Sequence, residues 1–196
     1  LLKAQVDGKE LIIGPKKIKE NSRNGNSYNL QPTKFKVITN SREIKELNVV
    51  SSGDFIIASP INIGKLEINM AGSGNILLEK KVEGNKLEIN LASSGSVVAS
   101  NIDLAGIECS LAGSGYIQIA GKADRAEYNL AASGNIKAYE CVTGKTECNI
   151  AGSGNIQTHT RNQLEANIVG SGNVYYKGNP TTSKSIIGSG KLKSAN

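Results

Sequence analysis

The residues of this chain with the clearest chemical potential are glutamates that recur at nearly constant spacing. One Glu stands in each of seven successive segments, 18–21 residues after the one before. If equivalent positions of these segments were stacked, adjacent carboxylates and neighbouring Asn oxygens could bind a hard cation such as Ca²⁺. The calcium-binding nonapeptide GGxGxD is absent, which weighs against that chemistry. The candidate surface ladder consists of Glu67, Glu88, Glu108, Glu127, Glu147 and Glu165, and Glu46 precedes it.

A second interpretation of the same glutamates is structural. Carboxylates stacked about 4.8 Å apart would repel one another by roughly 0.9 kcal/mol even in water. Cations stand two residues before four of the glutamates, at Lys65, Lys86, Arg125 and Lys145. Interleaved with the carboxylates, these cations would cancel much of the repulsion. We therefore expect a charge-paired face without a cofactor, and we keep Ca²⁺ binding as the alternative.

The other ionisable residues do not form a catalytic pattern. The four Asp residues fall in different segments, so the pair of carboxyls that glycoside hydrolysis requires is missing. The single histidine, His159, has no nucleophile beside it. Three cysteines without a CxxC spacing are an odd set, and we interpret them as small buried side chains. The sequence therefore predicts no catalytic residues, no metal ligands among the cysteines, and a protein that is not an enzyme.

Tyrosines are the second group of candidate binding residues. The chain has six Tyr, two Phe and no Trp. Tyr116, Tyr175 and Tyr176 are candidate aromatic contacts for a ligand, and Tyr139 is a further one. Because neighbouring side chains of a strand point to opposite faces, only one of Tyr175 and Tyr176 is expected to face outward.

An internal repeat must position all of these residues. The dipeptide Ser-Gly occurs eight times in register, with steps of 21, 21, 20, 19, 20, 18 and 18 residues between its glycines. The residues two after and four before each Gly are apolar, and the residue six before is mostly apolar. The residue five before each Gly, between those two apolar positions, is Asn or Ser. This alternation is typical of a strand with one buried face, and Gly permits a tight corner. The repeated glycines are Gly53, Gly74, Gly95, Gly115, Gly134, Gly154, Gly172 and Gly190.

The repeat predicts an all-β fold, namely a single-stranded right-handed parallel β-helix of about eight coils of 18–21 residues. Helical spacing and the LxxLxL pattern of leucine-rich repeats are both missing. The coil length varies between the second strand and the next Glu, which favours the right-handed form over left-handed helices built from strict hexapeptides. Stacked Asn side chains would hydrogen-bond along the axis, and stacking would create one continuous core.

The repeat begins near residue 41, which predicts two domains. We interpret residues 1–40 as an irregular basic N-terminal cap or leader, and residues 41–196 as the β-helix. Residues 1–45 hold ten cations and four anions, so the formal charge of +6 belongs to this stretch. It could be attracted to anionic glycans or lipid headgroups, or it could be a solvated cap. No nucleic-acid-binding motif is present, so no nucleic-acid partner is expected. At the other end, Lys184, Lys191 and Lys193 predict a charged terminating coil.

The string SREIKELNVVSSGDFII at 41–57 is followed by LEINMAGSGNI, LEINLASSGSV and AEYNLAASGNI. These strings resemble the putative auto-transporter adhesin, head GIN domain family, over roughly residues 41–196. The resemblance implies a right-handed β-helix exported by Gram-negative, Bacteroidetes-type bacteria to the periplasm, the outer-membrane surface or the medium. A leader removed before Leu1 would agree with export. The family has no known catalytic residues, so none is carried over.

We therefore expect a non-enzymatic, exported β-solenoid that serves as an adhesion or binding module for a glycan or protein ligand at the cell surface. The alternative is a structural scaffold that self-assembles through its coils or ends, because open strand edges invite pairing, and an oligomer is then possible. No apolar run is long enough to predict a transmembrane segment.

Overall fold

The computed structural model describes residues 2–7, 10–15, 43–50 and 52–195. The chain divides into two compact units, Leu1–Asn40 and Ser41–Asn196. In the first unit, β1 (Leu2–Asp7) and β2 (Glu10–Pro15) form an antiparallel pair in which Leu2 lies opposite Pro15. The sequence pattern did not predict this pair. The role of residues 1–40 as a cap or leader stays a prediction.

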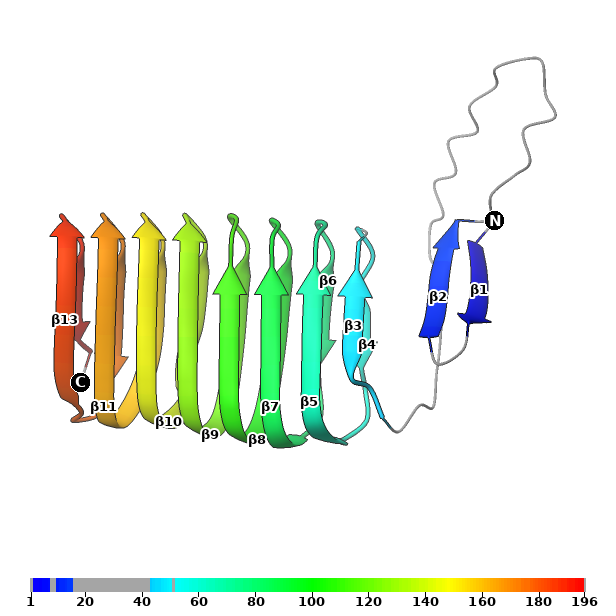
Figure 1. Ribbon diagram of the computed structural model, residues 1–196, viewed down its shortest axis with the longest axis horizontal. Helices are drawn as coiled ribbons and strands as arrows, with labels where there is room; N and C mark the ends of the chain where they lie inside the picture. The colour runs from blue at the N-terminus through cyan, green and yellow to red at the C-terminus, as the bar shows by residue number, and fades with distance from the viewer. Residues whose placement is uncertain (1, 8–9, 16–42, 51, 196) are drawn as a thin grey trace, which may run out of the picture. The chain divides into compact units, whose positions relative to one another are not determined.

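The second unit is an all-β solenoid whose described strands pair in parallel, as predicted. The seven steps between its eight Ser-Gly corners correspond to about seven turns. In Figure 1 the near limbs run upward, the far limbs return downward, and the coils advance leftward toward the C-terminus, so the helix is right-handed. The strands are β3 (Glu46–Val49), β4 (Phe55–Ile57), β5 (Ile61–Met70), β6 (Asn75–Leu78), β7 (Val82–Leu91), β8 (Ser96–Leu111), β9 (Tyr116–Ala132), β10 (Asn135–Gly152), β11 (Asn155–Gly170), β12 (Asn173–Lys177), β13 (Thr181–Gly188) and β14 (Lys191–Ser194).

Each coil has a front limb that ends at the Ser-Gly corner and a back limb that begins after it. The two limbs meet again at a lower corner, where β8 to β11 continue from the back limb into the next front limb as single long strands (Figure 1). The register shifts fall at this lower corner, for example between Ala99 and Ile102 of β8 and between Lys137 and Cys141 of β10. The variation in coil length therefore lies where the sequence predicted it.

Equivalent residues of successive coils stack directly on one another. Ile76 pairs with Val97, and Val97 pairs with Ile117. On the front limb the pairing runs Glu to Glu and Asn to Asn across coil after coil, for example between β5 and β7. The predicted columns are therefore real features of the fold.

The core fills the space between the two limbs. The three predicted apolar columns are buried in the central coils. Two further columns also point inward, at the positions eight before and four after each repeated Gly. The sequence pattern did not predict them because they mix residue types. The column four after the Gly holds Ile57, Leu78, Ala99, Ile119, Ala138 and Thr158. Toward the C-terminus the core becomes partly polar, with Thr146 Oγ1 lying 2.6 Å from Thr143 Oγ1 and 2.7 Å from Thr160 Oγ1.

The three cysteines are free and buried, as predicted. Tyr128 stacks between Cys109 and Cys148, and among the residues that the structure describes its buried hydroxyl has no hydrogen-bond partner beyond the neighbouring Cys141 thiol. Burial raises the pKa of Cys141 to about 12. These thiols therefore stay protonated and unreactive at neutral pH.

The glycines of the Ser-Gly corner are required by close backbone stacking. A Cβ built on Gly115 would collide with the carbonyl oxygen of Gly95, and one on Gly95 would collide with that of Gly74. The same collision recurs at every corner from Gly74 to Gly190. Because the obstacle is backbone of the preceding coil, no rotamer change can relieve it. Gly106, by contrast, lies in the middle of a front limb and has open space where a Cβ would stand.

A pair of substitutions tests this explanation. Gly115→Ala should destabilise the solenoid by about 1–3 kcal/mol, because it forces two backbones apart in a packed array. For a chain of this size that corresponds to a loss of several degrees, at roughly 2–4 °C per kcal/mol. Gly106→Ala is the matched control and should change stability by less than about 0.5 kcal/mol. Thermal unfolding followed by circular dichroism would measure both, and equal effects of the two substitutions would contradict the stacking argument.

Candidate functional site

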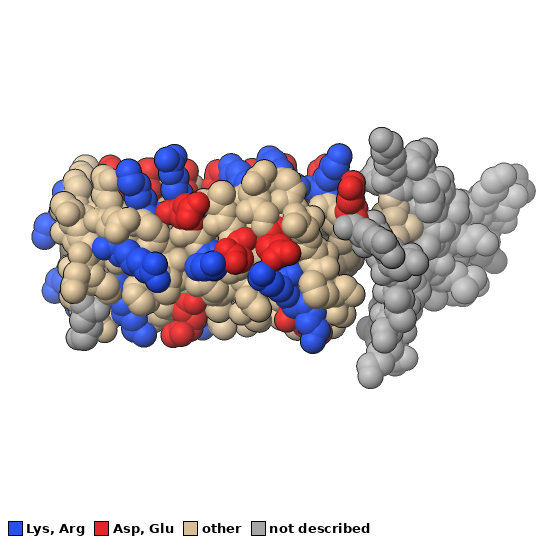
Figure 2. Space-filling model, turned by 90° about the horizontal axis from the view of Figure 1, so that it is seen from below, with Lys and Arg blue, Asp and Glu red and all other residues tan. Residues whose placement is uncertain are grey.

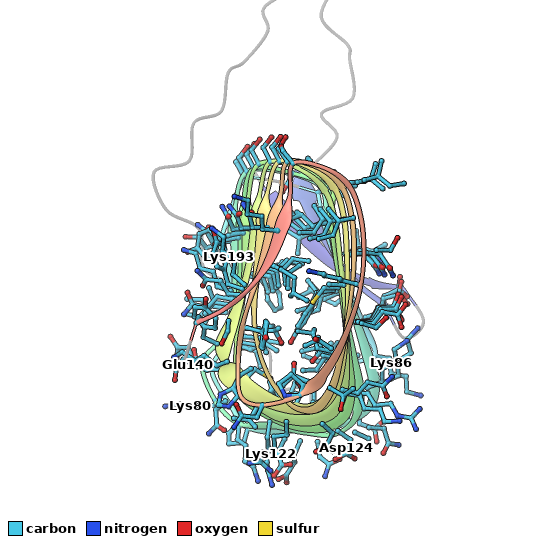
Figure 3. The ribbon with its side chains drawn as sticks, turned by 90° about the vertical axis from the view of Figure 1, so that its left-hand side faces the viewer. Lys80, Lys86, Lys122, Asp124, Glu140 and Lys193 are labelled. Carbon is cyan, nitrogen blue, oxygen red and sulfur yellow. The ribbon has the colours of Figure 1, made fainter. Side chains whose placement is uncertain are left out.

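The outward side chains of the front limbs form a charged face built from three adjacent columns. The Glu column continues from Glu46 to Glu165 in direct register, the Asn column lies two residues after it, and a cation column lies two residues before it. All three columns point outward because they alternate with buried positions along each strand. The side chains lie on the side of the solenoid that carries Lys86 in Figure 3.

Lysines of the cation column bridge consecutive carboxylates in the N-terminal coils. Lys65 Nζ lies 3.2 Å from Glu67 Oε2 and 3.0 Å from Glu88 Oε2. Lys86 Nζ in turn lies 3.6 Å from Glu88 Oε2 and 2.6 Å from Glu108 Oε2. The hydrogen bond from Lys65 holds the pKa of Glu88 below its ordinary value. The predicted charge pairing is thus present over these three glutamates.

The Asn column binds both to itself and to the glutamates. Asn69 Nδ2 donates to Asn48 Oδ1 in the preceding coil at 3.0 Å and to Glu67 Oε1 in its own coil at 3.0 Å. The hydrogen bond from Asn69, and next that from Lys65, lower the pKa of Glu67. Ser110 interrupts the amide ladder, which resumes where Asn149 donates to Asn129 at 2.9 Å. Each Asn stands two residues nearer to the Ser-Gly corner than its Glu, so the amides hold the carboxylates from the side that faces this corner.

The cation column is interrupted at Gly106, which carries no side chain. Beyond this gap, Arg125 and Lys145 are stacked in register and exposed, and neither forms an ion pair within the described part of the chain. A hollow of about 470 Å³ opens here, and we call it the front groove. Its charged lining consists of Lys86, Glu108, Arg125, Glu127, Lys145, Glu147 and Glu165.

A second, smaller hollow of about 340 Å³ continues the front groove toward the C-terminus. It shares Lys145 and Gln163 with the front groove. Asn162, Thr181 and Thr182 add amide and hydroxyl groups without charge. Together the two hollows present cations, carboxylates, amides and hydroxyls along one direction of the solenoid.

The structure places the candidate tyrosines on the opposite, back face, with one exception. Tyr116 and Tyr175 belong to outward columns of the back limbs, and Tyr116 is 38% exposed. Tyr176 instead pairs with the buried Thr158 and packs against the end of the core. Tyr176 is therefore a core residue rather than a surface contact. The reason is that neighbouring side chains of a strand point to opposite faces, as expected from the sequence for Tyr175 and Tyr176.

A second polar ladder, which the sequence reasoning missed, lies just past the Ser-Gly corner. Asn155 donates to Asn135 at 3.3 Å and Asn173 donates to Asn155 at 3.1 Å. At the other end, Asn75 Nδ2 donates to Asp54 at 2.8 Å. The residue directly after each repeated Gly carries this signal in the sequence, but Tyr116 and Ser96 break the run of amides.

The lower corner is also charged, and some of its charges are paired. Lys122 Nζ lies 3.1 Å from Asp103 Oδ2, and Lys81 pairs with Glu83. Figure 2, which views this corner, shows both signs of charge interspersed along it. Within the described ranges, no three His, Cys, Asp or Glu side chains are arranged to hold a metal ion, and no helix long and apolar enough to span a membrane is found.

Comparisons with known proteins support one family. A family model described as "Putative auto-transporter adhesin, head GIN domain" matches residues 1–83 and 73–180. A crystal structure of a putative lipid binding protein from Parabacteroides distasonis is 51% identical, with a TM-score of 0.93, and the match covers 100% of this chain and 79% of that one. A putative adhesin from Parabacteroides merdae is 32% identical with a TM-score of 0.86, covering 100% and 78%. No protein with a curated description matches the chain.

The lowered carboxyl pKa values of the N-terminal coils predict a dependence of stability on pH. A carboxyl whose pKa is lower in the folded state stabilises the fold above its ordinary pKa of about 4.3, and this contribution disappears as the pH falls through the folded value. Lys65→Gln should therefore lower the unfolding temperature modestly at pH 7, and this difference should shrink as the pH falls below the ordinary carboxyl pKa of about 4.3. Lys145→Gln, which removes an unpaired cation, should not change the pH dependence. The measurement is the unfolding temperature at each pH from 7 to 3. A difference between Lys65→Gln and the unmodified protein that stays constant over this range would contradict this assignment.

Calcium binding by the Glu column stays a prediction, and unfolding temperatures measured with Ca²⁺ and with a chelator would test it. We expect Ca²⁺ and a chelator to give the same unfolding temperature, because lysines already lie between the N-terminal carboxylates. A rise with Ca²⁺ that Glu127→Gln/Glu147→Gln abolishes would instead establish a cation site in the front groove.

Proposed function

The chain belongs to the putative auto-transporter adhesin, head GIN domain family, and from this membership we propose that it is a non-enzymatic adhesion module, exported to the periplasm or cell surface, that binds a glycan or protein ligand. The observation that carries the proposal is the front groove. In it, charged groups of both signs lie around a hollow, and the cations Arg125 and Lys145 have no partner within the described chain.

The groove suits a polar ligand of extended shape. Its walls are strands of five neighbouring coils, so the functional groups are held by a rigid backbone rather than by loops. Carboxylates and amides accept and donate hydrogen bonds, and the guanidinium of Arg125 can bind a carboxylate with two parallel hydrogen bonds. Sugar hydroxyls and the polar groups of a protein surface both match this set.

The repetition of the groove argues against hydrolytic chemistry. Glu127 accepts a hydrogen bond from Asn129 at 2.9 Å, and Glu147 accepts one from Asn149 at 3.0 Å. The two carboxylates therefore have nearly the same surroundings. A general acid and its partner base need surroundings that separate their pKa values, and a repeated environment does the opposite.

The scaffold alternative meets an obstacle at the C-terminal edge. The last coil carries Lys184 at a position that is apolar and buried in the central coils, and this lysine is exposed. Lys191 and Lys193 lie on the final strand, β14. Lysines on an edge strand are a common device against edge-to-edge pairing. This end of the solenoid is therefore poorly suited to stacking on a second copy.

A glycan and matrix-protein array tests the proposal. The unmodified protein should bind a subset of ligands, and Arg125→Gln/Lys145→Gln should reduce that binding at least tenfold, equivalent to about 1.4 kcal/mol. Gly106→Lys should also reduce it, because a lysine there would extend the Lys65 and Lys86 pairing and fill the groove, at a position with open space.

Lys122→Gln, at the lower corner, is the control and should bind normally. A blank array for the unmodified protein, or full binding by both groove variants, would overturn the proposal.

A further inference from the structure

The back face carries three lysines that lie over tyrosine rings. Lys137 Nζ is 4.8 Å from the ring centroid of Tyr116, Lys177 Nζ is 4.9 Å from that of Tyr139, and Lys193 Nζ is 5.8 Å from that of Tyr175. Each pair joins residues of different coils. We call this set of six residues the lysine–tyrosine strip.

The strip follows the axis of the solenoid. Lys137 stacks on Gln157, Gln157 on Tyr175, and Tyr175 on Lys193, so three coil steps separate the outer lysines. At about 4.8 Å per step, they are about 14 Å apart along the axis. Figure 3 places Lys193 and Glu140 on the side of the solenoid opposite Lys86, so the strip is separate from the front groove.

The strip is locally basic on a solenoid that is otherwise balanced. Residues 46–196 hold 13 cations and 13 anions. Among the described residues, the carboxylate within 4 Å of the strip's ammonium groups is that of Glu140, whose Oε1 lies 3.9 Å from Lys177 Nζ and whose side chain is 79% exposed. Lys137 and Lys193 have no such partner, and Lys191 adds a further cation on the same limb of the last coil.

The rings pre-organise the cations rather than offering themselves for stacking. A cation–π contact at an exposed aromatic face contributes about 0.5–1 kcal/mol of favourable free energy. A long lysine side chain that makes this contact therefore samples fewer conformations. Less conformational entropy is then lost when an anion binds. Because lysines cover the ring faces, the strip lacks the open platforms on which nucleobases stack. Tyr139 and Tyr175 are only partly exposed, and the more exposed ring of Tyr116 has Lys137 over its face, so the strip offers little apolar surface for insertion into a bilayer.

We propose that the lysine–tyrosine strip is a second binding site, which takes an acidic polysaccharide lying along the solenoid axis with its carboxylate or sulfate groups at Lys137, Lys177 and Lys193. The site does not depend on the front groove. Its attraction is mainly electrostatic, so the affinity should fall as the salt concentration rises.

Binding of the full chain to immobilised heparin and polygalacturonate tests the proposal, with neutral dextran as the reference. Lys137→Gln/Lys177→Gln/Lys193→Gln should weaken binding at least tenfold and reduce its salt dependence. The control Lys80→Gln/Lys81→Gln/Lys122→Gln makes the same change of net charge at the lower corner and should stay within about twofold. Both variants keep the basic residues 1–45, so the difference between them reports on the strip alone.

A second comparison tests the role of the rings. Tyr139→Leu/Tyr175→Leu keeps every charge and should weaken binding severalfold, whereas Tyr139→Phe/Tyr175→Phe should not. Equal losses in the two lysine variants, or tighter binding to phosphatidylglycerol vesicles or to a single-stranded oligonucleotide than to either polysaccharide, would overturn the proposal. Failure of the front groove and failure of the strip can be told apart, because the ligand array reports on Arg125→Gln/Lys145→Gln and the immobilised acidic polysaccharides report on the two lysine variants.

Discussion

Close contact between the backbones of successive coils at the Ser-Gly corner is the constraint on which the rest of the structure depends. Each corner glycine from Gly74 onward lies against the carbonyl oxygen of the glycine one coil earlier, at a distance that excludes a Cβ. This contact fixes where each coil begins. Since the side-chain period of a strand is two, a shift of one residue would turn every buried column outward, so fixing the corner fixes the register of the whole array.

Exact stacking creates an electrostatic difficulty as well as a core. It places Glu67 on Glu88 and Glu88 on Glu108, and the fold offsets the repulsion with interleaved lysines and a ladder of amides. The device stops at Gly106, where the cation column has no side chain. The front groove lies beside that interruption, and so do Arg125 and Lys145, which have no ion-pair partner among the described residues. The proposed binding groove therefore lies where a structural repeat is broken.

Regular columns could be predicted from the sequence, because a repeat makes the same physical demand eight times. The sequence therefore predicts the apolar columns, the Glu and Asn ladders, the variable lower corner and the buried cysteines. Features that depend on departures from the repeat could not be predicted. The Thr143–Thr146–Thr160 cluster replaces apolar residues in single coils, and the front groove requires knowing that Gly106 faces outward beside Arg125. The lysine–tyrosine contacts join different coils, and the contact between Lys137 and Tyr116 also joins different columns, so no local spacing reveals them.

The most direct test of the account measures distances between equivalent corners in solution. Nitroxide labels on cysteines introduced at the exposed Ser73, Ser153 and Ser189 can be compared in pairs by double electron–electron resonance, because the native cysteines are buried. Four coil steps separate Ser73 from Ser153 and six separate it from Ser189, so the account predicts attachment points about 19 Å and about 29 Å apart. Separations that do not grow in proportion to the number of coils would contradict it.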